Sequence, residues 1–208
     1  MPSPATCKEC AVNIIEKSNP WTWIAALYGL QVLGALSATR LLGLDSLDTL
    51  FPILLLLLGT ILSIILGRYS RSTNQDTWKL WIPAIIYALF IFTLSDNSFS
   101  DATDSFDTDL FHPVEYATLG LLFSWGWYPL LHKRGRKRLV LAVLAGGMIF
   151  AATDEIHQSF VPDRSPSFVD LSWDFIGLCL GLGLFLIALH LHERAKARRA
   201  GPMGARTP

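Results

Sequence analysis

Charged side chains are scarce in this sequence. Asp, Glu, Lys and Arg make up only 16% of its 208 residues, and 51% are hydrophobic, whereas an ordinary soluble domain carries about 25% charged residues. This shortage argues against a soluble globular protein. The less favoured alternative to a membrane protein is a soluble all-α bundle. The 17 basic and 17 acidic residues give a formal net charge of zero, and we expect no nucleic-acid partner.

Cysteine is also rare, with three in the whole chain. Cys7 and Cys10 have CxxC spacing, which could be half of a zinc site or a redox pair. No second pair of ligands lies nearby in the sequence, so we interpret both as incidental thiols, and Cys179 as a packing residue. Motifs of the GxSxG, HExxH and P-loop types are missing as well, so the usual signals of hydrolases and nucleotide-binding enzymes are absent.

Long apolar runs are what the sequence has instead. The segments Trp21–Thr39 and Thr49–Gly67 each contain 19 residues without a charge, a length that matches a bilayer better than a buried soluble helix. The sequence predicts an all-α fold, a polytopic transmembrane helix bundle of about six spans in a lipid bilayer. The predicted spans are about 21–39, 49–67, 79–95, 110–131, 139–158 and 168–191.

The distribution of charge predicts the orientation. The segment from Asp96 to Asp109 contains five aspartates and no base. Basic residues fall in three regions on the other side of a six-span topology: Arg68, Arg71 and Lys79; Lys133, Arg134, Arg136, Lys137 and Arg138; Arg194, Lys196, Arg198, Arg199 and Arg206. Because positive loops stay cytoplasmic, we predict cytoplasmic N and C termini in a multi-pass protein of the cytoplasmic (inner) membrane. An interfacial belt of tryptophans is predicted near the same ends: Trp21, Trp23, Trp78, Trp81, Trp125 and Trp127.

The fifth predicted span is too short without polar residues. Leu139 to Thr153 provides 15 uncharged residues, or about 22 Å of helix, against a hydrocarbon core of about 30 Å. The helix must therefore continue through Asp154, Glu155 and Gln158, which places these groups inside the membrane boundary.

The ends of the fourth and sixth spans bring polar residues to the same depth. His112 and Tyr116 lie four residues apart at the start of span four, with Glu115 beside that face. Ser167 and Asp170 form a capping-box pattern. Asp170, Asp174, Gly177 and Gly181 then follow along one stripe of span six, where the two glycines permit close approach of another helix.

These residues converge on the extracytoplasmic side of the predicted bundle. Ionisable groups inside a membrane are costly and by default mark function, although each one could also belong to an ordinary cap network. The candidate catalytic residues are His112, Asp154, Glu155 and Asp170. The candidate ligand-binding residues are Glu115, Tyr116, Gln158, Arg164 and Asp174.

The chemistry of this cluster stays open at the level of sequence. The carboxylates could serve general acid–base work on a lipid-linked substrate, bind a divalent cation or relay protons in a carrier. Arg164 suits a phosphate or carboxylate contact, so a phosphate-bearing amphiphile is a candidate partner. The residues identify no particular metal or cofactor, and they do not decide whether the protein is an enzyme.

The polar motif resembles the VanZ-like membrane family. The matching residues are Asp154-Glu155-Ile156-His157-Gln158, Pro162-Asp163-Arg164, Asp170-x3-Asp174-x2-Gly177-x3-Gly181, His112-x3-Tyr116 and Ser95. The resemblance implies a small helical membrane protein of the cell envelope, linked in the founding member to resistance to the glycopeptide antibiotic teicoplanin. Asp109, Asp163 and Asp174 replace residues that are commonly Lys, Gly and Asn there, which makes this site more acidic.

The resemblance covers about residues 80–190 and suggests a division of the chain. We predict a cytoplasmic N-terminal segment (1–20) that is not a cleaved signal peptide, and a two-span N-terminal extension (21–78). A four-span VanZ-like domain (79–192) and a disordered basic tail (193–208) follow. Three hypotheses for function remain: a site for an amphiphilic or lipid-linked ligand, a small proton- or cation-coupled carrier, and a non-catalytic membrane partner or scaffold.

Overall fold

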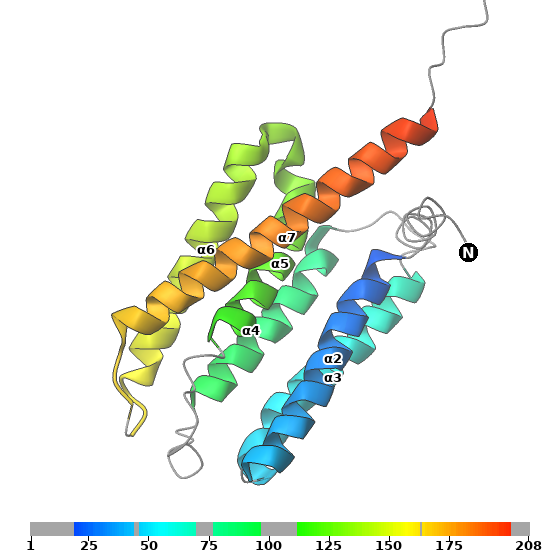
Figure 1. Ribbon diagram of the computed structural model, residues 1–208. Helices are drawn as coiled ribbons and strands as arrows, with labels where there is room; N and C mark the ends of the chain where they lie inside the picture. The colour runs from blue at the N-terminus through cyan, green and yellow to red at the C-terminus, as the bar shows by residue number, and fades with distance from the viewer. Residues whose placement is uncertain (1–18, 44–45, 70–76, 97–111, 163, 201–208) are drawn as a thin grey trace, which may run out of the picture.

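A computed structural model describes residues 19–43, 46–69, 77–96, 112–162 and 164–200. These residues form six long helices and no strand (Figure 1), so the all-α prediction is confirmed. The long helices are α2 (Pro20–Leu42), α3 (Ser46–Tyr69), α4 (Ile82–Ser95), α5 (His112–Leu131), α6 (Arg136–Gln158) and α7 (Phe168–Ala200). Short 3-10 turns precede α4 (η1, Thr77–Trp81) and α6 (η3, His132–Arg134). The predictions for Cys7, Cys10, Asp109 and Asp163 lie outside the described residues.

Five described segments are long and apolar enough to cross a membrane. They are Pro20–Leu41, Thr49–Tyr69, Thr77–Ser95, Arg136–Gln158 and Phe168–Arg198. The remaining long helix, α5, is less apolar because its 20 residues include His112, Glu115 and several Gly, Trp and Tyr residues. At about 1.5 Å per residue α5 is still about 30 Å long, and α4, α6 and α7 all contact it. The chain is thus a multi-pass membrane protein in which α5 is shielded by its neighbours.

Successive helices run in opposite directions, so the start of α2 and the end of α7 lie at the same end of the bundle (Figure 1). The ends of α3 and α5 and the starts of α4 and α6 also lie there. The described basic residues that gather at this end are Arg68, Lys79, Lys133, Arg134, Arg136, Lys137, Arg138, Arg194, Lys196 and Arg198. The polar residues at the end of α6 and the start of α7 lie at the opposite end.

Helices α2 and α3 form a pair that joins the other helices through polar contacts inside the bundle. The Tyr28 hydroxyl donates to the carbonyl oxygen of Pro83. The side-chain amide of Gln31 donates to the Tyr87 hydroxyl (2.9 Å) and to Thr118 Oγ1 (2.8 Å). One glutamine on α2 therefore bridges to both α4 and α5.

Several tryptophans near the basic end pack inside the bundle, which differs from the predicted interfacial belt. Trp21 is buried and meets Trp125 edge-on at 6.2 Å between ring centroids. Trp81 meets Trp127 in the same way at 4.9 Å. Only the more exposed rings, such as that of Trp23, are available to the membrane interface. A large aromatic ring buries more area when it fills a gap between helices than when it lies at the membrane interface.

Two predictions about α7 need correction. The helix continues to Ala200, although we expected a disordered tail from residue 193. The added turns are rich in Ala, Lys and Arg, which favour helix, and positive charge at a helix C-terminus interacts well with the helix dipole. Cys179 is exposed on the helix surface, so it does not fill a gap between helices.

The closest helix crossing in the bundle joins α5 and α7 at the two glycines of the predicted stripe. A Cβ atom built at Gly177 would lie 2.6 Å from the carbonyl oxygen of Pro113 and 3.0 Å from the backbone nitrogen of Ala117. One built at Gly181 would overlap the carbonyl oxygen of Ala117. On α5, Gly120 makes the reciprocal approach, because its Cβ would lie 2.8 Å from the carbonyl oxygen of Leu178. This crossing fixes the start of α7 against the start of α5.

Candidate functional site

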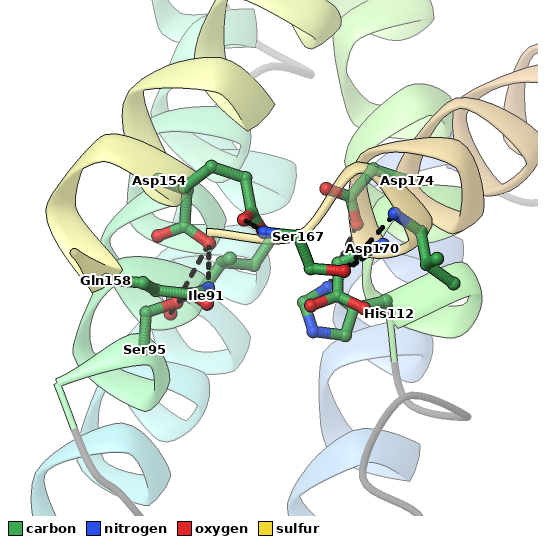
Figure 2. A network of polar contacts seen from close by, with 10 residues as sticks. Ile91, Ser95, His112, Asp154, Gln158, Ser167, Asp170 and Asp174 are labelled. Carbon is green, nitrogen blue, oxygen red and sulfur yellow. Dashed lines mark hydrogen bonds and ion pairs between the residues drawn. The ribbon is translucent and has the colours of Figure 1, made fainter. Parts of the chain in front are cut away.

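The first part of the polar cluster joins α4 to α6 through a buried carboxylate. Asp154 is 1% exposed. Its Oδ2 accepts hydrogen bonds from Ser95 Oγ at 2.8 Å and from Gln158 Nε2 at 3.2 Å (Figure 2). Ser95 is the last residue of α4, and Asp154 and Gln158 lie one turn apart near the end of α6. The end of α4 is thereby held against the last turns of α6.

The second part joins the end of α6 to the start of α7. Ser167 Oγ accepts hydrogen bonds from the backbone nitrogens of Val169 and Asp170, both at 3.2 Å, as the capping pattern predicts. In a capping box the side chain at the third helical position returns a hydrogen bond to the cap's own N–H. Here the N–H of Ser167 donates instead to Glu155 Oε2, at 2.6 Å (Figure 2). A carboxylate of α6 therefore completes the cap of α7.

The third part joins α5 to α7. His112, the first residue of α5, lies with its Nδ1 3.0 Å from Asp174 Oδ1 (Figure 2). The side chains of His112 and Asp174 are 14% and 1% exposed. The close backbone crossing at Gly177 explains why these two side chains meet, since Gly177 lies less than one turn beyond Asp174 on the same helix.

Tyr116 lies among these three groups without a hydrogen-bond partner. Its ring is 0% exposed, and its hydroxyl is buried and unpaired. The charges that reach this hydroxyl come from four carboxylates: Asp174, Asp154, Glu115 and Glu155. Asp154 Oδ1 and Glu155 Oε1 are also buried and unpaired, although the other oxygen of each carboxylate is hydrogen bonded.

Arg164 and Glu115 occupy less constrained positions. Arg164 lies half-buried in the connection between α6 and α7, and its backbone nitrogen donates to the carbonyl oxygen of Val161 at 3.3 Å. In the described part of the chain its guanidinium forms no ion pair with an acid of the cluster. Glu115 is half-buried on α5 and interacts electrostatically with both His112 and Arg164. Among the described residues, the histidine rather than the arginine pairs directly with an acid of the cluster.

Sequence reasoning missed one pair at the rim of the cluster. His157 Nε2 lies 2.6 Å from Asp96 Oδ1, and the imidazole stacks on Phe92 with 4.0 Å between ring centroids. Asp96 directly follows Ser95, the last residue of α4. Because Ser95 belongs to the family motif, this neighbouring position could have predicted that Asp96 lies near the cluster. The bridge from Gln31 to Tyr87 and Thr118 was also not predicted. A single glutamine in an apolar run does not indicate which residues it contacts.

The cluster is rich in hydrogen-bond acceptors and poor in positive charge. Five acids (Glu115, Asp154, Glu155, Asp170 and Asp174) lie near one histidine and one arginine. Within the ranges that the structure describes, no three His, Cys, Asp or Glu side chains are arranged to hold a metal ion. Such a site can bind a group that donates hydrogen bonds, and His112 with Asp174 could move a proton.

Comparison with known proteins gives one family. The sequence model of the family described as VanZ/LLP1 matches residues 49–189. The matched region starts before the residue-80 boundary of the resemblance and takes in α3, so the division of the chain into an extension and a domain stays a prediction. Curated proteins and solved structures give no significant match.

Proposed function

The chain belongs to the VanZ/LLP1 family, and we propose that it binds the polar head group of an amphiphilic or lipid-linked molecule in the polar cluster of α4, α5, α6 and α7. The bound molecule would keep its apolar chain in the bilayer beside the helices.

The observation that carries this proposal is the set of buried polar atoms without partners. The hydroxyl of Tyr116 and one oxygen each of Asp154 and Glu155 are buried and unpaired. An unpaired buried polar atom costs about 1–3 kcal/mol. Unpaired buried atoms also occur outside the cluster, at Trp21 Nε1, Gln31 Oε1 and Trp125 Nε1, but none of these is a carboxylate or hydroxyl oxygen. A ligand head group that donates hydrogen bonds would remove this cost.

The side of the membrane is part of the proposal. Most of the described Lys and Arg residues lie at the end of the bundle opposite the cluster, whereas Arg40 and Arg164 lie at the cluster's end. Loops with an excess of positive charge stay cytoplasmic. The cluster would then lie in the outer leaflet of the cytoplasmic membrane, where envelope precursors on lipid carriers are accessible. A change in sensitivity to teicoplanin would be an indirect result of altered handling of such an amphiphile.

Labelling of single cysteines tests this orientation. Cys7, Cys10 and Cys179 are first replaced, and Ser165→Cys or Lys133→Cys is introduced, both at exposed positions. A membrane-impermeant thiol reagent is expected to label Ser165→Cys in intact cells and to label Lys133→Cys only after the membrane is opened. The reverse pattern would place the cluster on the cytoplasmic side and contradict the outer-leaflet site.

Native mass spectrometry tests the binding itself. Protein purified in a mild non-ionic detergent is expected to retain an amphiphile, and the double variant Tyr116→Phe/Glu155→Gln is expected to lose at least about nine-tenths of it, because tenfold weaker binding corresponds to only about 1.4 kcal/mol. Glu193→Gln, an exposed acid at the other end of α7, is the matched control and should keep the wild-type occupancy. Equal occupancy in the double variant and the control would mean that the cluster is structural and that the protein acts as a scaffold.

A further inference from the structure

We propose that the head group recognised by this cluster carries a primary ammonium. The inference rests on the proposed function and names the chemical class of the ligand. The same chemistry could come from an amino lipid or from a free amine, and the experiment below separates the two.

Charge is the first argument. Among the described residues, the bases that act on the five acids of the cluster are His112 and Arg164, with His157 at the rim paired to Asp96. His112 is already paired with Asp174 at 3.0 Å. A cluster with this excess of carboxylates repels a phosphate and attracts a cation, because opposite charges interact strongly where water is excluded. The absence of a suitable metal-ligand group in the described residues favours an organic cation.

Hydrogen-bonding capacity is the second argument. A primary ammonium carries three N–H donors and no acceptor. The Tyr116 hydroxyl oxygen, Asp154 Oδ1 and Glu155 Oε1 can all accept, and all are buried and unpaired. Gln158 Nε2 and Ser95 Oγ direct their hydrogens to the other oxygen of Asp154, so Oδ1 keeps its capacity to accept. A primary ammonium therefore matches the cluster in hydrogen-bond donors as well as in charge.

The tyrosine is the third argument. Its ring is fully buried and its hydroxyl lies where the charges of four carboxylates reach it. An aromatic face attracts cations, and the hydroxyl adds an acceptor beside it. A phenylalanine would fill the same space without leaving an unpaired hydroxyl, so tyrosine costs stability here unless its oxygen meets a ligand.

Thermal unfolding of the full chain in dodecyl maltoside micelles tests the inference with four probes: dodecylammonium, dodecyltrimethylammonium, dodecyl phosphate and butylammonium. At about ten times its dissociation constant, dodecylammonium is expected to raise the Tm of the wild type by about 4 °C. Dodecyl phosphate should give no rise, and dodecyltrimethylammonium, which has no N–H donor, should give a smaller one than dodecylammonium. Glu193→Gln should respond as the wild type does.

The variant Tyr116→Phe separates binding from folding. Without a probe its Tm is expected to equal or exceed that of the wild type, because the unpaired hydroxyl is gone. With dodecylammonium it should lose at least half of the rise in Tm, and Asp154→Asn should lose the rise as well. An equal rise in Tyr116→Phe, Asp154→Asn and the wild type would show a general micelle effect and would overturn the inference.

The remaining outcomes show whether the ammonium or the amphiphile site is wrong. A rise with dodecyl phosphate that depends on the cluster overturns the ammonium and leaves the amphiphile site standing. No rise with any probe overturns the ammonium, and native mass spectrometry then decides separately whether an amphiphile binds. An equal rise with butylammonium supports the ammonium but identifies a free amine as its source and contradicts the amphiphile.

Discussion

Gly181→Leu is expected to remove nearly all correctly folded protein. A side chain at this position would meet the backbone of α5, because its first carbon would overlap the carbonyl oxygen of Ala117 and lie 2.8 Å from the backbone nitrogen of Leu121. Overpacking costs about 1–3 kcal/mol when flexible side chains can yield. Here the obstacle is backbone, so we expect a loss of at least about 3 kcal/mol and separation of α7 from α5.

The measurement is the yield of monodisperse protein in detergent, compared at equal expression. Gly34→Leu on α2 is the matched control, because a Cβ built at Gly34 has no neighbour within 4 Å. The control is expected to give a yield near that of the wild type. Similar yields from both variants would mean that the crossing at Gly181 does not hold the bundle together.

His112→Ala is expected to cause the second large loss. Asp174 is 1% exposed and His112 Nδ1 lies 3.0 Å from its carboxylate. Removing one partner of a buried ion pair costs about 3–5 kcal/mol, because the other charge is left without compensation. For a chain of this size we expect the Tm in detergent to fall by about 10 °C.

Two further variants show whether the loss comes from the buried charge. Asp174→Asn added to His112→Ala should recover part of the Tm, since the charge that lacked a partner is removed. His157→Ala is the matched control, because His157 also pairs with an aspartate but the two side chains are 25% and 54% exposed. Exposed pairs contribute at most about 1 kcal/mol. Equal losses at His112 and His157, or no recovery in the double variant, would contradict the buried pair.

The prediction that the polar cluster lies inside the membrane boundary rests on length alone. Fifteen uncharged residues cannot cross the hydrocarbon core, so α6 had to carry Asp154 and Glu155 into it. The glycines of α7 were predictable in the same way, because two glycines one turn apart below the carboxylates have no other obvious use on a membrane helix. Both inferences depend on helix geometry, which sequence spacing specifies directly.

The partners within the cluster were not predictable, because they depend on how each helix is rotated about its axis. By its residue type Arg164 suited a carboxylate contact, yet it forms no ion pair among the residues described. His112 instead pairs with Asp174, and the N–H of Ser167 is bound by Glu155 rather than by Asp170. The role of Trp21 was misjudged for the same reason, since an amphipathic ring suits the interface and the interior equally well.

The bridge from Gln31 has a consequence for how the protein is made. Helix α2 enters the membrane before α4 and α5 because chains are synthesised from the N-terminus. Until those helices arrive, the amide of Gln31 has neither Tyr87 nor Thr118 to receive its hydrogens, and a polar group in hydrocarbon is costly without partners. The newly inserted α2–α3 hairpin therefore carries unpaired side-chain N–H groups of Gln31, and these find acceptors when α4 and α5 arrive. During biogenesis this favours docking of the first hairpin onto the later helices over its release into the lipid.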